Sequence, residues 1–224
     1  MRAIIVSMII LFGWSHLTGQ SVSHKVSFDP SGKIYNKHTG KRVSDEEFSK
    51  YITDNPRVSF EHEIDKYGEV ARYLLDTTTR EVAPRTEEDQ TKPGKPLPEF
   101  VFTSMTGETV ASQELKGQWI VLKFEIFLPM LDVAALKQLD TKIESMSNKE
   151  DFVMIDCFIE TADEITSKID GELNNIFLVS DAMNFQLRYS IVRYPQIILI
   201  DPQGIVVGYY SKESEIDWSG LTVN

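Results

Sequence analysis

Apolar and polar residues change their spacing several times along the second half of the chain. Largely apolar runs at residues 119–124 and 152–159 predict buried strands. Between these runs, apolar residues recur at the spacing of one helix face, which predicts a helix that begins at Pro129 and ends near Ser147. The pattern therefore predicts a strand, a helix and a second strand in succession.

Helical and strand-like patterns then alternate towards the C-terminus. Helices are predicted at 162–169 and 183–189, and strands at 175–179, 196–201 and 205–210. The turn between the last two strands makes them a hairpin. This order predicts an α/β fold in which a central mixed sheet is flanked by helices.

A small N-terminal α+β region, residues 21–76, comes before this pattern. Ser44 and Glu47 have the S-x-x-E spacing of a capping box, which predicts a short helix to about Thr53. Residues 58–75 alternate around a central turn and predict a hairpin with one apolar face. Because this region is small, we expect it to pack against the main domain or against a partner.

Two further segments complete the predicted organisation. Residues 77–94 lack periodicity, are rich in Thr, Glu, Pro and Lys, and predict a solvated linker to a main domain at 95–224. Residues 1–19 have Arg2, an apolar stretch and then small or polar residues, as in a cleaved signal peptide. A buried N-terminal element and an uncleaved anchor are the alternatives. We expect a periplasmic or secreted protein without stable membrane insertion after signal removal.

The net charge of −11 narrows the classes of partner. An acidic surface repels phosphate backbones, and the sequence has no basic run or stripe, so we expect no nucleic-acid partner. The apolar fraction of 42% and the charged fraction of 25% are typical of a globular protein.

Three motifs carry a resemblance to a known family. They are the segment 94–100 (GKPLPEF), the segment 106–124, which ends in LKGQWIVLKF, and the segment 194–204 (YPQIILIDPQG). In order and spacing they resemble the thioredoxin-like superfamily, in the branch of exported thiol–disulfide oxidoreductases that borders the peroxiredoxins. The resemblance implies a thioredoxin-like fold and a cis peptide bond before Pro195. A trans proline that opens an edge strand is the alternative.

The reactive cysteines of that family are missing. Family members carry W-C-x-x-C after the apolar strand, where the start of a helix lowers the pKa of the first thiol. Here Pro129-Met130-Leu131-Asp132 stands in its place, so Pro129 and Asp132 occupy degenerate active-site positions. A shorter loop would place Phe127 and Met130 there. Neither alignment supplies a thiol, and we assign no catalytic residue.

The single cysteine, Cys157, lies in an apolar run. It is either an inert packing residue or a reactive thiol, and the run favours packing. None of the four histidines lies in 95–224, so we expect no metal site and no cofactor there. Glu61 and Glu63 flank His62 on an alternating strand, where the glutamates should lie on the face opposite the histidine.

We interpret the chain as a non-catalytic protein- or peptide-binding module. Phe127, Leu128, Tyr194 and Pro195 are the candidate binding residues, because an extended peptide can pair with the backbone beside a cis-proline without any cysteine. The expected partner is another exported protein or an extended peptide. The alternatives are a thiol–disulfide oxidoreductase or peroxiredoxin-type enzyme that uses Cys157 or partner thiols, and a protein whose working part is the N-terminal region.

Overall fold

The computed structural model describes residues 32–55, 58, 60–78, 84–125 and 127–223. The predicted signal peptide, residues 1–19, lies outside the described residues. Within them, no helix is long and apolar enough to cross a membrane.

The main domain is built around a five-stranded mixed sheet with the strand order β10-β9-β6-β7-β8. The strands are β6 (Trp119–Phe124), β7 (Phe152–Cys157), β8 (Ile176–Val179), β9 (Gln196–Ile200) and β10 (Val206–Tyr210). β6, β7 and β8 are parallel, β9 runs antiparallel to β6, and β10 runs antiparallel to β9. The predicted mixed sheet and terminal hairpin are confirmed.

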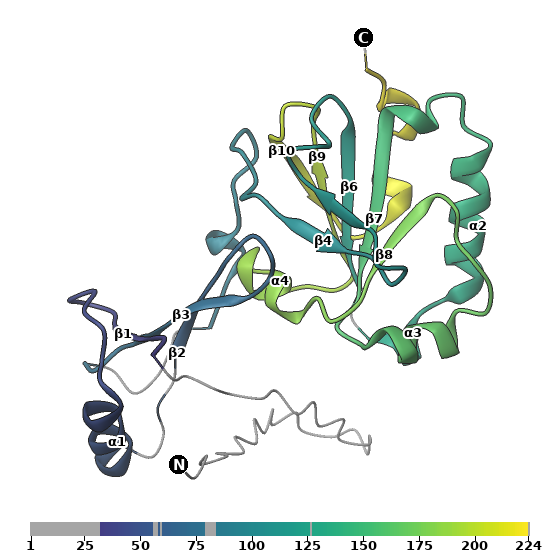
Figure 1. The fold of residues 1–224 in the computed structure, drawn as a ribbon. Coiled ribbons are helices and arrows are strands. Elements are labelled where there is room, and N and C mark those ends of the chain that lie inside the picture. The colour runs from purple at the N-terminus through teal and green to yellow at the C-terminus, as the bar shows by residue number, and fades with distance from the viewer. Residues whose placement is uncertain (1–31, 56–57, 59, 79–83, 126, 224) are drawn as a thin grey trace.

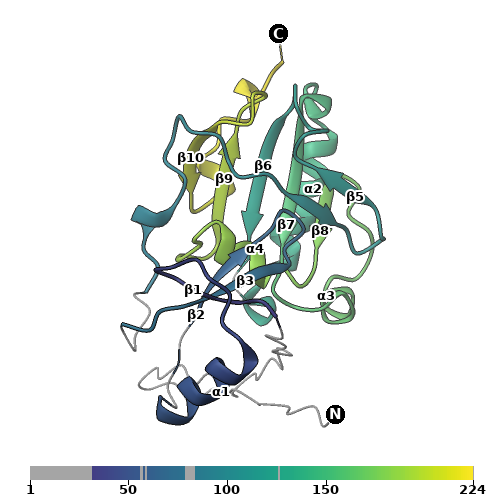
Figure 2. The same cartoon turned by 60° about the vertical axis from the view of Figure 1, so that its left-hand side comes forward.

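Both faces of this sheet are buried. Successive side chains of a strand point to opposite faces, so each strand contributes residues to both layers of the core. Leu122 and Phe124 pack on one face with α4 (Met183–Arg188) and with the hairpin of β4 (Val101–Thr103) and β5 (Thr109–Ala111). Val121 packs on the other face with α2 (Val133–Glu144), α3 (Ala162–Lys168) and the C-terminal segment around Trp218. Figures 1 and 2 show the sheet between these layers. This is the thioredoxin-like fold that the three motifs imply.

The structure corrects the predicted start of the long helix. Leu128–Met130 form a short 3₁₀ turn, and α2 begins only at Val133. Leu131 is extended, with a ψ of 125°, and this interrupts the helical path. Asp132 then acts as the N-cap, since its side chain accepts a hydrogen bond from the Ala135 N–H at 3.0 Å. Pro129 therefore precedes the helix instead of opening it.

The N-terminal unit is a second, smaller sheet with one helix. Its elements are β1 (Ile34–Asn36), α1 (Asp45–Asp54), β2 (Phe60–Ile64) and β3 (Val70–Leu75). The strand order is β1-β3-β2, with β1 parallel and β2 antiparallel to β3. The predicted hairpin and the Ser44–Glu47 capping box are confirmed. Only Ile34, Tyr73 and Leu75 form its buried centre among the described residues.

The second half of the expected linker differs from a solvated segment. Residues 86–97, here named the strap, run along β9 and β10. Gln90 is buried, and its amide donates to the Ser190 carbonyl at 3.0 Å and to Gln196 Oε1 at 2.9 Å. Gly94 N–H donates to the Val206 carbonyl at 2.8 Å. A polar segment is fixed here by specific hydrogen bonds, which apolar periodicity does not reveal.

Candidate functional site

Two loops meet at one end of the central sheet. β6 ends at Phe124 and β9 begins at Gln196, and these two residues are paired in the antiparallel register. The loop that follows β6 and the loop that precedes β9 therefore leave the sheet side by side. The peptide bond between Tyr194 and Pro195 is cis, as the resemblance implied. This end of the sheet brings together the two segments that were predicted to form a binding surface.

The side chain of Gln186, on α4, joins the two loops. Its Nε2 donates to the Glu125 carbonyl at 3.4 Å, and its Oε1 accepts from the Tyr194 hydroxyl at 2.7 Å. Gln186 is only 3% exposed, so water competes little for these hydrogen bonds. No pattern in the sequence pointed to Gln186, because a single glutamine within a short helix has no distinguishing spacing.

The predicted binding residues differ in exposure. Leu128 is only 7% exposed, so its side chain anchors the loop and is poorly placed to touch a partner. Phe127, Tyr194 and Pro195 are half-buried. Met130 is 74% exposed and is the prominent apolar side chain of this loop. Its exposure depends on the 3₁₀ turn that ends in an extended Leu131, which the predicted helix did not contain.

The buried carboxylate of Glu160 supports the loop after β6 from the interior of the domain. Glu160 follows β7, and its Oε1 accepts a hydrogen bond from the Leu128 N–H at 2.8 Å. The other oxygen, Oε2, is buried and has no hydrogen-bond partner among the described residues. Glu160 therefore fixes the start of the 3₁₀ turn. An acidic residue directly after a buried strand was the signal that could have pointed to it.

The degenerate active-site positions hold no reactive group. Pro129 is exposed and lies within the 3₁₀ turn, and Asp132 is the N-cap of α2. Cys157 is 0% exposed and packs on the α4 face of the sheet. Burial, together with the nearby Asp156, raises the pKa of the Cys157 thiol. The predicted packing role for this cysteine is confirmed.

The N-terminal unit contacts the main domain through the turn between β2 and β3 (Figures 1 and 2). The guanidinium of Arg188, on α4, donates to the carbonyls of Ile64 and Glu99. Asn184 Nδ2 donates to the Gly68 carbonyl at 2.7 Å. The Val101 N–H donates to the Lys66 carbonyl at 2.6 Å. The expected packing against the main domain is confirmed, and it places this unit at the end of the sheet where the two loops meet.

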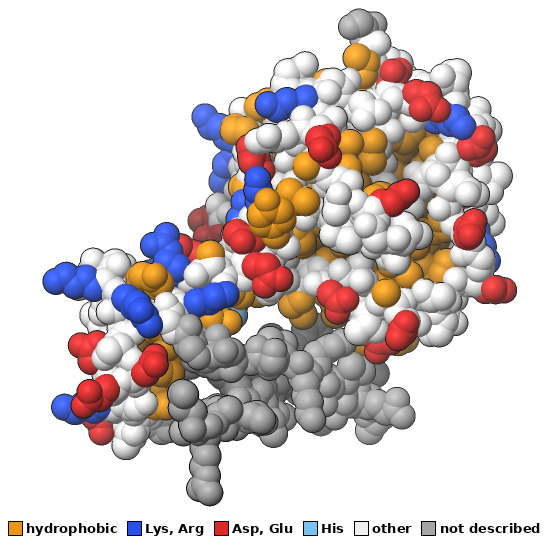
Figure 3. Space-filling model, viewed as in Figure 1, with side chains coloured by type: hydrophobic (Ala, Val, Ile, Leu, Met, Phe, Trp, Pro, Cys, Tyr) orange, Lys and Arg blue, Asp and Glu red, His pale blue; other side chains and the backbone are white. Residues whose placement is uncertain are grey.

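The side chains around His62 divide between the two faces of the N-terminal sheet, as predicted. Glu63 forms an ion pair with Arg72 at 2.5 Å, and Glu61 forms one with Lys37. Figure 3 shows basic side chains over this part of the unit, at β1 and β3. His62 lies on the other face, with its ring 5.2 Å from that of Tyr73. Burial lowers the pKa of His62. Within the described residues, no three His, Cys, Asp or Glu side chains are arranged to hold a metal ion.

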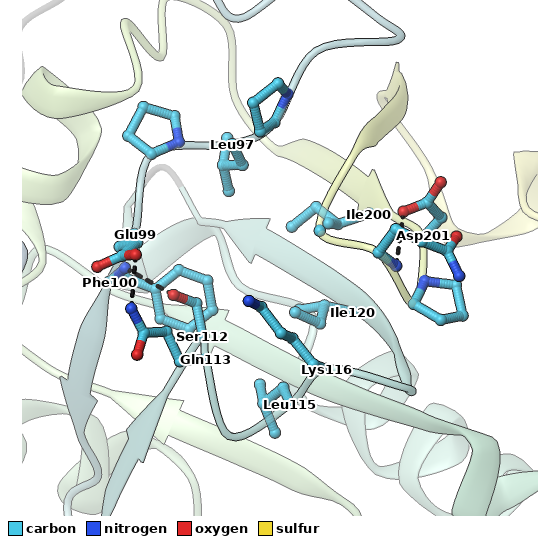
Figure 4. Close-up of a pocket in the computed structure, with 15 residues that line it drawn as sticks. Leu97, Glu99, Phe100, Ser112, Gln113, Leu115, Lys116, Ile120, Ile200 and Asp201 are labelled. Carbon is cyan, nitrogen blue, oxygen red and sulfur yellow. Dashed lines mark hydrogen bonds between the residues drawn. The ribbon is translucent and has the colours of Figure 1, made fainter.

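A cavity of about 190 Å³ lies at the opposite end of the sheet (Figure 4). Its walls are mainly apolar, and the Lys116 side chain extends towards it. Two pairs of polar groups on its wall bind one another: the Phe100 N–H donates to Ser112 Oγ at 3.1 Å, and Gln113 Nε2 donates to Glu99 Oε1 at 2.6 Å. These groups stabilise the β4–β5 hairpin and are not directed at a ligand.

Comparisons with known proteins find similarity among solved structures only. No protein-family model matches the chain, and no curated protein matches it. Among solved structures, the thioredoxin domain of a thiol-disulfide oxidoreductase from Bacteroides vulgatus is similar at 17% identity, with a TM-score of 0.45, over 56% of this chain and 93% of that one.

Two further solved structures are similar over about the same share of the chain. The pneumococcal exposed lipoprotein thioredoxin from Streptococcus pneumoniae is 20% identical, with a TM-score of 0.43, over 51% of this chain and 89% of that one. A thiol peroxidase from Chromobacterium violaceum is 17% identical, with a TM-score of 0.43, over 55% of this chain and 77% of that one. The strand order of the main domain and the cis-proline before β9 are those of a thioredoxin-like fold.

Proposed function

We propose that this protein is an exported thioredoxin-fold protein that has lost the redox-active cysteines and binds an extended segment of another exported protein. The binding surface comprises Phe127, Met130, Tyr194 and Pro195, with Leu128 as its buried anchor. The partner pairs with the backbone beside the cis-proline and places an apolar side chain against Met130.

The observation that carries this proposal is the state of the only thiol. Thiol–disulfide exchange requires a thiolate that can reach a disulfide. The sequence has one cysteine, and Cys157 is fully buried with a raised pKa. The loop before α2 presents Pro129 and Met130 in place of thiols. A dithiol reaction within one chain is therefore excluded, which favours a binding role for this surface.

The geometry of the two loops supports binding. Hydrogen bonds with the buried side chains of Gln186 and Glu160 hold the two loops in place, so the surface is ordered before a partner binds. A preorganised surface loses less conformational entropy on binding. Methionine suits such a surface, because its flexible, polarisable side chain adapts to different apolar groups.

The proposal of export rests on the pattern of residues 1–19. A positive Arg2, an apolar stretch and a small, polar end are the features of a secretory signal. Fractionation of cells that express the full chain tests this part separately. Recovery of the uncleaved chain in the cytoplasm would contradict export and an exported partner, but it would leave the location of the binding surface open to the tests below.

Site-specific cross-linking tests the binding surface. A photoreactive amino acid is placed at position 130 of the full chain, and a second chain carries it at the exposed Gln203, at the opposite end of the sheet. We expect position 130, and not position 203, to yield a specific adduct with one exported protein. Equal labelling from both positions would contradict the assignment of the surface.

The cross-linked partner is then purified and its affinity is measured directly. We expect Met130→Glu to weaken binding by about tenfold to a hundredfold, the range that results when a charge replaces an apolar contact worth about 1.5–3 kcal/mol. Val207→Glu, at another exposed apolar side chain on β10, should bind like the wild type. Equal affinity of both variants and wild type would remove Met130 from the surface.

Enzymatic activity is the alternative, and one comparison decides it. Insulin reduction and peroxide consumption are measured for wild type and for Cys157→Ala. We expect neither protein to show activity above the uncatalysed rate. Activity that disappears in Cys157→Ala would replace the binding proposal with a single-thiol mechanism.

A further inference from the structure

Three buried ionisable side chains meet a fourth, partly exposed one on the sheet face that α2 covers. The ammonium of Lys123, on β6, contacts Glu125 and lies 2.6 Å from Glu213 Oε1 and 3.9 Å from Asp156 Oδ2. Three of the four belong to the sheet or directly follow it, and Glu213 comes from the C-terminal segment. Lys123, Glu125 and Asp156 are all buried.

The charges of this cluster do not balance. Three carboxylates surround one ammonium, so full ionisation would leave a charge of −2 inside the protein. An ionised carboxylate is costly to bury unless it is paired and hydrogen-bonded. Glu125 and Glu213 take the close positions on Lys123. Asp156 lies farther from the Lys123 ammonium, at 3.9 Å.

Asp156 also has the least polar support of the three acids. It is 0% exposed, and neither of its carboxylate oxygens has a hydrogen-bond partner among the described residues. Its register partner on β6 is Lys123. A neutral carboxylic acid satisfies this environment better than a carboxylate does, because it carries no charge to be stabilised.

Among the described residues, the elements packed around the cluster offer Asp156 no second cation. α2 covers this face with Leu136, Leu139 and Ile143, and its buried Asp140 is already bound to Asn175. The neighbouring Cys157 points to the opposite face. The groups that act on Asp156 are Lys123 and the nearby backbone N–H of Cys157, which favour its ionised form, and Glu125 and Glu213, which oppose it.

We propose that this cluster is a proton-binding site, in which Asp156 takes up one proton from solvent as the domain folds and keeps it at neutral pH. Protonation forms the O–H bond of a carboxylic acid and lowers the cluster charge from −2 to −1. Lys123 then keeps Glu125 and Glu213 as its two counter-ions. Burial and the two glutamates raise the pKa of Asp156 to about 8, against the opposing effect of Lys123.

This site makes folding depend on pH in a defined direction. The pKa of Asp156 is raised from 3.8 in the unfolded chain to about 8 in the folded one. Its contribution to stability is complete below the unfolded value and is lost as the pH rises through the folded value. Between these values the folded state holds one more proton, so the unfolding constant rises about tenfold per pH unit on this account.

Denaturant unfolding of the full chain between pH 5 and 7.5 tests the site. Asp156→Asn mimics the protonated acid and should make the unfolding constant rise less steeply than in wild type, by about tenfold per pH unit. Asp163→Asn, at an exposed position on α3, should retain the wild-type slope. Histidines titrate equally in all three proteins and cancel in the comparison. Equal slopes for wild type and Asp156→Asn would overturn the proposal.

A direct measurement covers the case in which Asp156→Asn does not fold. Carboxyl-labelled aspartate in wild type is followed by carbon NMR as the pH is raised from 5 to 9. We expect one aspartate resonance to shift in the upper half of this range while the others remain constant. If every aspartate resonance is already at its ionised position at pH 5, Asp156 holds no proton and the proposal fails.

Discussion

The α-carbon of Gly68 lies directly against the ring of Phe185, across the contact between the N-terminal unit and α4. A methyl group added to Gly68 would lie 2.6 Å from Phe185 Cε2, closer than two carbon atoms can approach. Gly68 also has a φ of +79°, in the region that other residues rarely adopt. Two independent constraints therefore require glycine at the turn that joins the unit to the main domain.

Gly68→Ala should loosen this contact. We expect about 2–5 kcal/mol of destabilisation, the sum of a left-handed backbone penalty of about 1–2 kcal/mol and an overpacking penalty of about 1–3 kcal/mol. Gly107→Ala is the matched control, with a φ of +87° and no atom within 4 Å of the added methyl. Gly107→Ala should lose only the about 1–2 kcal/mol of stability that the left-handed backbone costs. Hydrogen exchange of β2 and β3 should accelerate in Gly68→Ala alone, and equal effects in both variants would show that the contact with Phe185 is unimportant.

Removal of Lys123 should lower the free energy of unfolding, because the three acids of the cluster then have no cation. Lys123→Met leaves Glu125, Asp156 and Glu213 without their cation and should cost about 3–5 kcal/mol at pH 7. Lys123 lowers the pKa of Glu213 against the opposing effect of burial, so their ion pair stabilises the fold above the usual glutamate range and is lost in acid. The difference between wild type and variant should therefore shrink as the pH falls from 7 to 4. Urea unfolding at both pH values measures it, and a constant difference would indicate a packing effect.

The thiol of Cys157 should react only when the protein opens. A disulfide reagent needs access to the thiolate, and burial raises the pKa of this thiol. We expect labelling of the native protein to be at least about 10³-fold slower than labelling in denaturant, as is typical of a group exposed only by unfolding. The two rates are measured with the same reagent at pH 8. Similar rates would mean that Cys157 is accessible in the native state.

The hydrogen bond between Tyr194 and Gln186 should stabilise the candidate surface measurably. Tyr194→Phe removes the hydroxyl and leaves Gln186 Oε1 buried without that donor, which should cost about 1 kcal/mol or somewhat more. Tyr67→Phe, at a side chain that is mostly exposed, should change stability by less than about 0.5 kcal/mol. Thermal unfolding compares them. An equal loss in the two variants would show that the bond does not hold the loops together.

The regular elements were predictable because their signals are local. The largely apolar run at residues 119–124 and the Ser44–Glu47 capping box carry their own structural preference, and both are found where expected. The cis peptide before Pro195 followed from resemblance to a family. The start of α2 was misplaced because Pro129 favours the first turn of a helix, whereas the extended Leu131 and the capping side chain of Asp132 move the start onward.

The supports of the candidate surface were not predictable. Gln186 and Glu160 act through partners far away in the sequence, and single polar residues have no periodicity to mark them. The same holds for Asp156, whose distance from Lys123 depends on the pairing of β6 with β7. The exposure of Met130 depends in turn on the path of the loop. Long-range pairing therefore had to be known before these residues could be interpreted.

The strap determines how the main domain can be cut out for study. A fragment that begins at Lys95, the boundary expected from the sequence, would lose Gln90, the ion pair of Glu87 with Arg193, and the Thr91 carbonyl that receives the Tyr209 hydroxyl. It would also uncover the Val206 carbonyl on β10, an edge strand, and uncovered edges promote sheet-to-sheet aggregation. A fragment that begins at Thr86 keeps these partners and protects the edge, so it is the one to express.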